Sequence, residues 1–159
     1  VLITEALPGA VDLEAHLRDT AGPAARPGAR AELARALARH LRRFFDRGLV
    51  HRDCKAQNLL VLAGAPLRFA WIDMDGVRCV RDAGRGERVA ALARLWVSLR
   101  EVPGLTRGDC ARFLREFGAA FGSRFDWRRT WREIAALARQ KLAQQTARRA
   151  WKLEHYGRT

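Results

Sequence analysis

Two short polar motifs, separated by a pair of apolar segments, constrain the fold of this chain more than any other feature. Residues 51–58 are His-Arg-Asp-Cys-Lys-Ala-Gln-Asn, and residues 72–76 are Ile-Asp-Met-Asp-Gly. Between them, Leu59–Leu62 and Arg68–Ile72 have the apolar composition of strands, and Ala63–Pro66 has the Gly and Pro of a turn. We therefore predict a small β-hairpin with one motif before it and the other at its exit. Polar residues on loops that a rigid hairpin holds are typical of functional sites.

The rest of the chain is predicted to be mainly helical, which makes the fold class mainly α with a small β-hairpin. Val1–Glu5 is β-prone, Asp12–Asp19 predicts a short helix, and Ala21–Gly28 predicts a loop. Glu32–Asp46 predicts a strong helix that ends near Gly48. We expect the last helix to run to about Leu153. Apolar residues at helical spacing predict the core faces, namely Leu33, Leu37, Leu41 and Phe44; Val89, Leu92, Trp96 and Leu99; Phe113, Leu114, Phe117 and Phe121; and Trp127, Trp131, Ile134, Ala138 and Leu142.

The composition excludes several classes of protein. An apolar fraction of 48% in 159 residues is that of a globular domain, too high for a disordered chain. No run of eighteen apolar residues occurs, so no transmembrane helix is expected. The cysteines Cys54, Cys79 and Cys110 lie far apart without a Cys-x-x-Cys pair, which argues against zinc and against a disulfide framework. A reducing, cytoplasmic setting is the natural expectation.

The charge is strongly positive. The chain has 30 Lys and Arg against 17 Asp and Glu, a formal net charge of +13. This excess predicts acidic partners, for example nucleic acid, anionic lipid head groups or phosphorylated sugars. A solvated arginine-rich surface without a partner is the alternative.

The two motifs contain the residue types that phosphoryl transfer requires. The first fits the kinase catalytic loop, His-Arg-Asp with Asn after four intervening residues, and the second lies where a kinase has its magnesium-binding loop. Asp53 could orient an attacking hydroxyl and accept its proton, and Lys55 could neutralise charge on the phosphate. Asn58 and Asp73 offer hard oxygen ligands for Mg²⁺, with Asp75 as a further candidate. ATP and Mg²⁺ are the expected cofactors.

Each of these residues also has a purely structural interpretation. Asp53 could cap a turn, and His51 could be a buried histidine with its hydrogen bonds satisfied. Asp73 and Asp75 could be solvated turn residues. The order and spacing of the whole set favour the catalytic interpretation.

The chain resembles the bacterial lipopolysaccharide kinases, the family that includes 3-deoxy-D-manno-octulosonic acid (Kdo) kinase and the core heptose kinases. The resemblance lies in His51–Asn58 and in Trp71–Arg78, whose Asp-x-Asp is similar to that family. It implies a protein-kinase-like C-terminal lobe over residues 8–159. Residues 1–7 resemble the last N-lobe strand and the hinge, which implies that the main chain of Glu5 and Leu7, together with Lys55, contacts ATP.

The resemblance further implies transfer of the ATP γ-phosphate to a sugar hydroxyl of the lipopolysaccharide inner core. No Ala-Pro-Glu follows Gly76, and no Ser, Thr or Tyr occurs between Gly76 and Val97, so a peptide substrate and activation by phosphorylation are not expected. The partners expected are the acidic glycolipid and the anionic cytoplasmic face of the inner membrane, with the basic last helix near that surface. Nucleic acid is not an expected partner.

Some parts of a kinase site are not found in the sequence. It has no glycine-rich phosphate loop, no paired β3 lysine, and no carboxylate in Ala91–Leu99 to hold the catalytic loop. We therefore expect the C-lobe of a kinase, either as a fragment or as a natural truncation, that binds ATP weakly by itself. Two alternatives stay open: a kinase-like phosphotransferase for small metabolites or for protein Ser/Thr, and a non-catalytic remnant that binds acidic partners.

Overall fold

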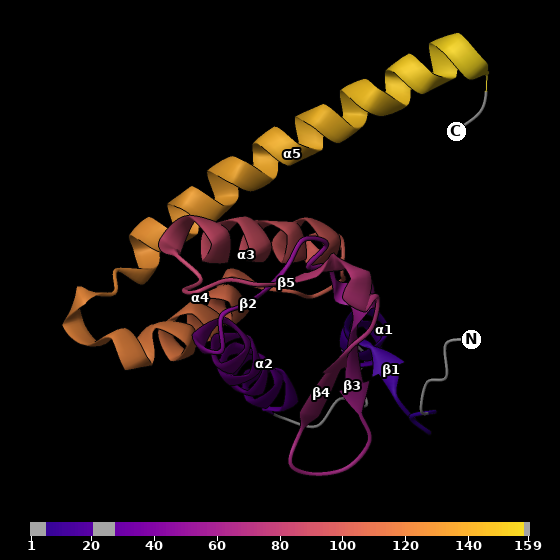
Figure 1. Cartoon of the computed structure of the whole chain (residues 1–159). Coiled ribbons are helices and arrows are strands. Elements are labelled where there is room, and N and C mark those ends of the chain that lie inside the picture. The colour runs from indigo at the N-terminus through magenta and orange to yellow at the C-terminus, as the bar shows by residue number, and fades with distance from the viewer. Residues whose placement is uncertain (1–5, 21–27, 158–159) are drawn as a thin grey trace.

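The computed structural model describes residues 6–20 and 28–157 (Figure 1). The predicted strand at Val1–Glu5 and most of the predicted loop at 21–28 lie outside the described residues. The elements in chain order are β1 (Val11–Asp12), α1 (Leu13–Asp19), α2 (Ala29–Asp46), β2 (Leu49–His51), the 3-10 turn η1 (Ala56–Asn58), β3 (Leu59–Leu62), β4 (Arg68–Trp71), η2 (Met74–Gly76), β5 (Val77–Cys79), α3 (Arg85–Leu99), α4 (Arg107–Gly118), η3 (Ala119–Arg124) and α5 (Trp127–Tyr156).

Helices α1, α4 and α5 begin at side chains that cap them. Asp12 accepts a hydrogen bond from Ala15 N at 2.9 Å and starts α1, and Asp126 accepts from Arg128 N and Arg129 N at the start of α5. Helix α2 begins at Ala29, three residues before the predicted start, and ends at Asp46. Gly48, with φ of 69°, follows its cap and permits the turn into β2.

The hydrophobic core lies between these helices and the sheet of β1, β3 and β4. Helix α2 packs on α4, and α3 packs on α5. The predicted mainly helical fold class is confirmed, and each predicted stripe contributes to this core. The buried members are Leu33, Leu37, Leu41, Phe44, Leu92, Leu99, Leu114, Phe117, Ile134 and Ala138. The aromatic residues Trp96, Phe113, Phe121, Trp127 and Trp131 are partly buried and pack against them.

The predicted hairpin is present, and a third strand joins it. Strands β3 and β4 pair antiparallel with Leu59 opposite Trp71, and β1 pairs with the other edge of β3. A second sheet, of β2 and β5, was not predicted because each strand has only three residues, too few for an alternating pattern. It pairs His51 with Val77 and thereby joins the start of the first motif to the end of the second.

Helix α5 has two different halves. Its first half packs on α3, and its second half extends away from the body of the molecule (Figure 1). Residues 143–157 are all exposed, and the helix continues to Tyr156 rather than Leu153. Within the described ranges, no helix is long and apolar enough to span a membrane.

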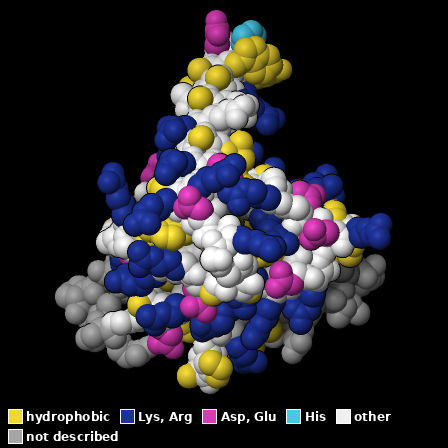
Figure 2. Space-filling view, turned by 90° about the vertical axis from the view of Figure 1, so that its left-hand side faces the viewer, with side chains coloured by type: hydrophobic (Ala, Val, Ile, Leu, Met, Phe, Trp, Pro, Cys, Tyr) yellow, Lys and Arg dark blue, Asp and Glu magenta, His cyan; other side chains and the backbone are white. Residues whose placement is uncertain are grey.

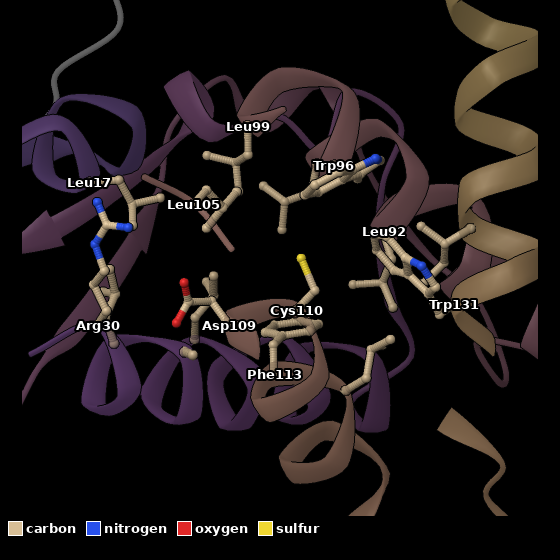
Figure 3. A pocket seen from close by; sticks show the side chains of 16 residues that line it. Leu17, Arg30, Leu92, Trp96, Leu99, Leu105, Asp109, Cys110, Phe113 and Trp131 are labelled. Atoms are coloured by element: carbon tan, nitrogen blue, oxygen red, sulfur yellow. The ribbon is translucent and has the colours of Figure 1, made fainter. Parts of the chain in front are cut away.

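A small apolar cavity of about 90 Å³ lies inside the helical core. Figure 3 shows side chains from α1, α2, α3, α4 and α5 around it, with Trp96 and Trp131 among them. No residue of the two polar motifs lines it. The cavity is therefore a feature of the core, separate from the candidate active site.

Candidate active site

His51 connects the two motifs from inside the fold. It is the last residue of β2, and its ring is 1% exposed and lies 4.8 Å from the ring of Trp71. Its Nδ1 accepts a hydrogen bond from Asp53 N at 3.1 Å, and its Nε2 lies 3.4 Å from the carbonyl oxygen of Ile72. The ring therefore contacts the backbone of both motifs and orients one relative to the other.

Gly76 allows the second motif to approach this histidine. The N–H of Arg52 donates to Gly76 O at 2.7 Å. A Cβ on Gly76 would lie 2.7 Å from His51 Cε1 and 2.9 Å from Nδ1. Gly is therefore required here because of the close approach, and its φ is not in the left-handed region.

Asn58 lies between the carboxylates of Asp53 and Asp73. Its Nδ2 lies 3.0 Å from Asp53 O, 3.4 Å from Asp53 Oδ2 and 3.3 Å from Asp73 Oδ2. Its backbone is also fixed, because its carbonyl oxygen accepts a hydrogen bond from Ile72 N at 3.0 Å. The side chain is 5% exposed. The structure therefore brings together three of the residues that the sequence proposed.

Lys55 lies beside the Asp53 carboxylate. Its Nζ is 2.6 Å from Asp53 Oδ2, and the two side chains are 40% and 50% exposed. This ion pair places a positive charge beside the carboxylate at a position that solvent and a ligand can reach. Because the pair is exposed, it contributes little to stability.

Cys54 differs from its neighbours in the loop. It is 1% exposed, and burial raises the pKa of its thiol to about 12. A thiol with such a pKa is protonated at neutral pH, so Cys54 packs in the core and is not a nucleophile.

Asp73 has an unusual backbone. Its φ of 59° and ψ of 51° make it the one residue other than Gly with positive φ in the described part of the chain. This conformation costs free energy for an L-residue, and such outliers concentrate at functional sites. Asp75 follows in η2, where its side chain is exposed and its carbonyl oxygen accepts from Arg52 Nη2 at 3.4 Å. No contact joins the Asp75 carboxylate to Asn58 or Asp73 among the described residues.

The donor set fits Mg²⁺ bound together with a phosphate. The Asn58 amide nitrogen is used within the site, so its oxygen remains as a ligand beside the Asp73 carboxylate. The described ranges contain no cluster of three or more His, Cys, Asp or Glu side chains that could hold a metal. One carboxylate and one amide are typical of Mg²⁺ sites in which phosphate oxygens and water complete the coordination.

Ser98 is a positioning residue that the sequence analysis missed. Its Oγ accepts a hydrogen bond from Ala56 N at 2.9 Å and donates to Leu95 O at 2.8 Å. It thereby ties the loop of residues 51–58 to α3, the role for which the sequence analysis sought a carboxylate in Ala91–Leu99. Ser98 is the one hydroxyl residue in α3, and this was the available signal.

The main-chain contacts with ATP that the sequence predicts at Glu5 and Leu7 lie partly outside the described residues. Glu5 is not described. Leu7 is 38% exposed, and its carbonyl oxygen accepts a hydrogen bond from Ala10 N at 3.1 Å. Its N–H is therefore the group expected to meet a base, and this assignment remains a prediction.

Comparisons with known proteins agree with this geometry. One solved structure, titled "WaaP in complex with acyl carrier protein", matches with 29% sequence identity and a TM-score of 0.66, over 93% of this chain and 59% of that one. This chain thus spans just over half the length of that relative. No curated protein matches. The sequence profile described as "Lipopolysaccharide kinase (Kdo/WaaP) family" matches residues 1–117, and the chain belongs to this family of kinases.

Proposed function

We propose that this chain is the catalytic C-lobe of an enzyme that transfers the γ-phosphate of ATP to a sugar hydroxyl of the lipopolysaccharide inner core. One observation carries the proposal. The amide of Asn58 lies within 3.4 Å of the carboxylates of both Asp53 and Asp73, with the Lys55 ammonium 2.6 Å from Asp53. General base, phosphate-neutralising charge and metal ligands thus occupy one small region, as phosphoryl transfer requires.

The residues have separate roles in this proposal. Asp53 orients the sugar hydroxyl and accepts its proton as the hydroxyl oxygen bonds to the γ-phosphorus. The bond from that phosphorus to the bridging oxygen breaks, and ADP leaves. Lys55 stabilises the negative charge on the transferred group. Asn58 and Asp73 would hold Mg²⁺, which neutralises phosphate charge when it is bound, and Asp75 remains a further candidate ligand. The main chain of Glu5 and Leu7 would contact the adenine.

The tip of α5 supports a peripheral contact with the cytoplasmic face of the inner membrane. Trp151, Leu153 and Tyr156 are 48%, 47% and 69% exposed, and Figure 2 shows apolar side chains gathered at this tip above a face rich in Lys and Arg. An exposed aromatic group beside basic residues suits an anionic interface. Sedimentation with phosphatidylglycerol vesicles tests this proposal. If Trp151→Ala binds these vesicles as well as wild type does, the proposed membrane contact is wrong.

The catalytic proposal is tested with labelled ATP and a Kdo-containing lipopolysaccharide acceptor. We expect the intact gene product to transfer label and Asp53→Ala to lose nearly all transfer. The matched control is Asp46→Ala, which removes a half-exposed carboxylate at the end of α2. If Asp53→Ala and wild type transfer label equally, the assignment of Asp53 is wrong. A panel of aminoglycosides, choline and peptides distinguishes the other phosphotransferase classes.

A further inference from the structure

A wide cleft opens directly beside the Asp53–Lys55 pair. Its volume is about 660 Å³, and its walls come from α1, the catalytic loop, the second half of α3 and the middle of α5. The cleft is therefore lined by elements that are far apart in the sequence. Arg94 of α3 and Lys141, Arg148 and Arg149 of α5 are among the residues that line it.

The cleft has an excess of positive charge. Seven basic side chains and three carboxylates line it. Each carboxylate already has a basic partner: Arg18 lies 2.6 Å from Glu14, Lys55 lies 2.6 Å from Asp53, and Arg100 lies 2.7 Å from Glu101.

The remaining four cations have no such partner. Within the described ranges, no ion pair joins Arg94, Lys141, Arg148 or Arg149 to a carboxylate. Burial lowers the pKa of Lys141, and the charge of Arg94 lowers it further, so these like charges interact across the cleft from α3 and α5. An anion bound among them would relieve this repulsion.

The position of these cations on α5 follows from helical spacing. Counted from Lys141, the residues Gln145, Arg148 and Arg149 follow after four, seven and eight positions. These intervals place the four side chains on one face of the helix. That face lies toward the cleft, so these arginines are not simply part of a basic surface. The amides of Gln57, Gln144 and Gln145 lie in the same cleft and suit sugar hydroxyls.

On the basis of the proposed function, we infer that this cleft is the acceptor subsite, in which Arg94, Lys141, Arg148 and Arg149 bind an anionic group of the sugar acceptor. The anion is a carboxylate or a phosphate, both of which arginine binds through paired N–H groups. With its anion held against α5, the acceptor lies across the cleft, and its hydroxyl reaches Asp53. The arginines bind the acceptor and take no part in proton transfer.

The test is the acceptor KM of Arg148→Gln/Arg149→Gln in the intact gene product. We expect that KM to rise by a factor of about 10 to 100, because each lost charged hydrogen bond weakens binding by about tenfold. The KM for ATP should stay within about twofold. The matched control is Arg132→Gln/Arg139→Gln, which removes the same charge from exposed positions of α5 that do not line the cleft. An unchanged acceptor KM, or an equal rise in the control, would overturn the inference.

Two modified acceptors identify the source of the anion. Methyl esterification of the carboxylates or removal of the phosphates should raise the wild-type KM, and the double variant should no longer respond to the effective modification. If neither modification changes the wild-type KM, the inference is wrong. Calorimetry of the unmodified core oligosaccharide in the Asp53→Ala background compares binding with and without Arg148→Gln/Arg149→Gln in the absence of turnover. This readout separates failure of the subsite from failure of the catalytic assignment.

Discussion

Removal of the Ser98 hydroxyl should loosen the catalytic loop without touching a catalytic group. In Ser98→Ala, the N–H of Ala56 loses its acceptor at 2.9 Å. Ala56 is 0% exposed, so its N–H depends on this acceptor. An unsatisfied buried N–H costs about 1–3 kcal/mol. The lost donation to Leu95 O matters less, because α3 supplies that carbonyl with a backbone donor.

We therefore expect the free energy of unfolding to fall by about 2 kcal/mol. For a chain of this size, that corresponds to a decrease in Tm of about 4–8 °C. We also expect kcat of the intact gene product to fall by about tenfold, since small displacements of a catalytic loop are costly. Urea unfolding monitored by circular dichroism measures the first quantity, and labelled-phosphate transfer measures the second.

Two variants serve as controls for this prediction. Ser123→Ala removes the same hydroxyl at an exposed position in η3, and Ser98→Thr keeps an acceptor oxygen at the original position. Both should stay within about 0.5 kcal/mol of wild type. If Ser98→Ala also stays within that range, the hydrogen bond from Ala56 does not hold the loop, and the argument fails.

Three further predictions concern other parts of the site and core. Gly76→Ala should lower kcat by at least about tenfold, because its Cβ would lie 2.7 Å from the His51 ring; activity equal to that of Gly86→Ala, a position with open space, would refute this. Burial, followed by the charges of Arg43 and Arg47, lowers the pKa of His40 below 6.5, so only the unfolded chain takes up this proton in mildly acid solution. The free energy of unfolding should therefore fall as the pH drops below 6.5. The urea midpoints at pH 7.5 and 5.5 should differ less in His40→Phe than in wild type. An equal difference in both proteins would count against this role of His40. Cys54 should resist Ellman's reagent at pH 8 in the folded protein, because burial raises the pKa of its thiol to about 12, whereas the exposed thiol of Cys79 should react at once. Equal rates of thiol modification in Cys79→Ser and Cys54→Ser would contradict this prediction.

The positions of the hairpin and helices were predictable because they depend on local patterns. Strand β3 has the predicted bounds, and β4 ends one residue early, at Trp71. The core faces of α2, α3 and α4 follow from apolar residues three and four positions apart. The membership of Asp53, Asn58 and Asp73 in one site was also predictable, since their spacing is that of a known catalytic arrangement.

Other parts of the site were not predictable, because they depend on pairs of short segments. The β2–β5 sheet has three residues on each side and leaves no periodic signal. The left-handed backbone of Asp73 has no signature in sequence, because Asp is common in many turn types. The contact of Ser98 with Ala56 joins residues 42 positions apart.

By itself, the sequence determined which groups are present for chemistry, their order along the chain, and the hairpin and helices that carry them. The reason is that spacing and periodicity are local properties. Only the tertiary structure decided that His51 orients both motifs, that Ser98 bonds to the backbone of the first motif, and that the middle of the basic last helix lines a cleft beside Asp53. These features depend on the packing of α1, α3 and α5 around the catalytic loop. The two motifs therefore lie together in one site, and one wall of the cleft beside it comes from α5, at the far end of the sequence.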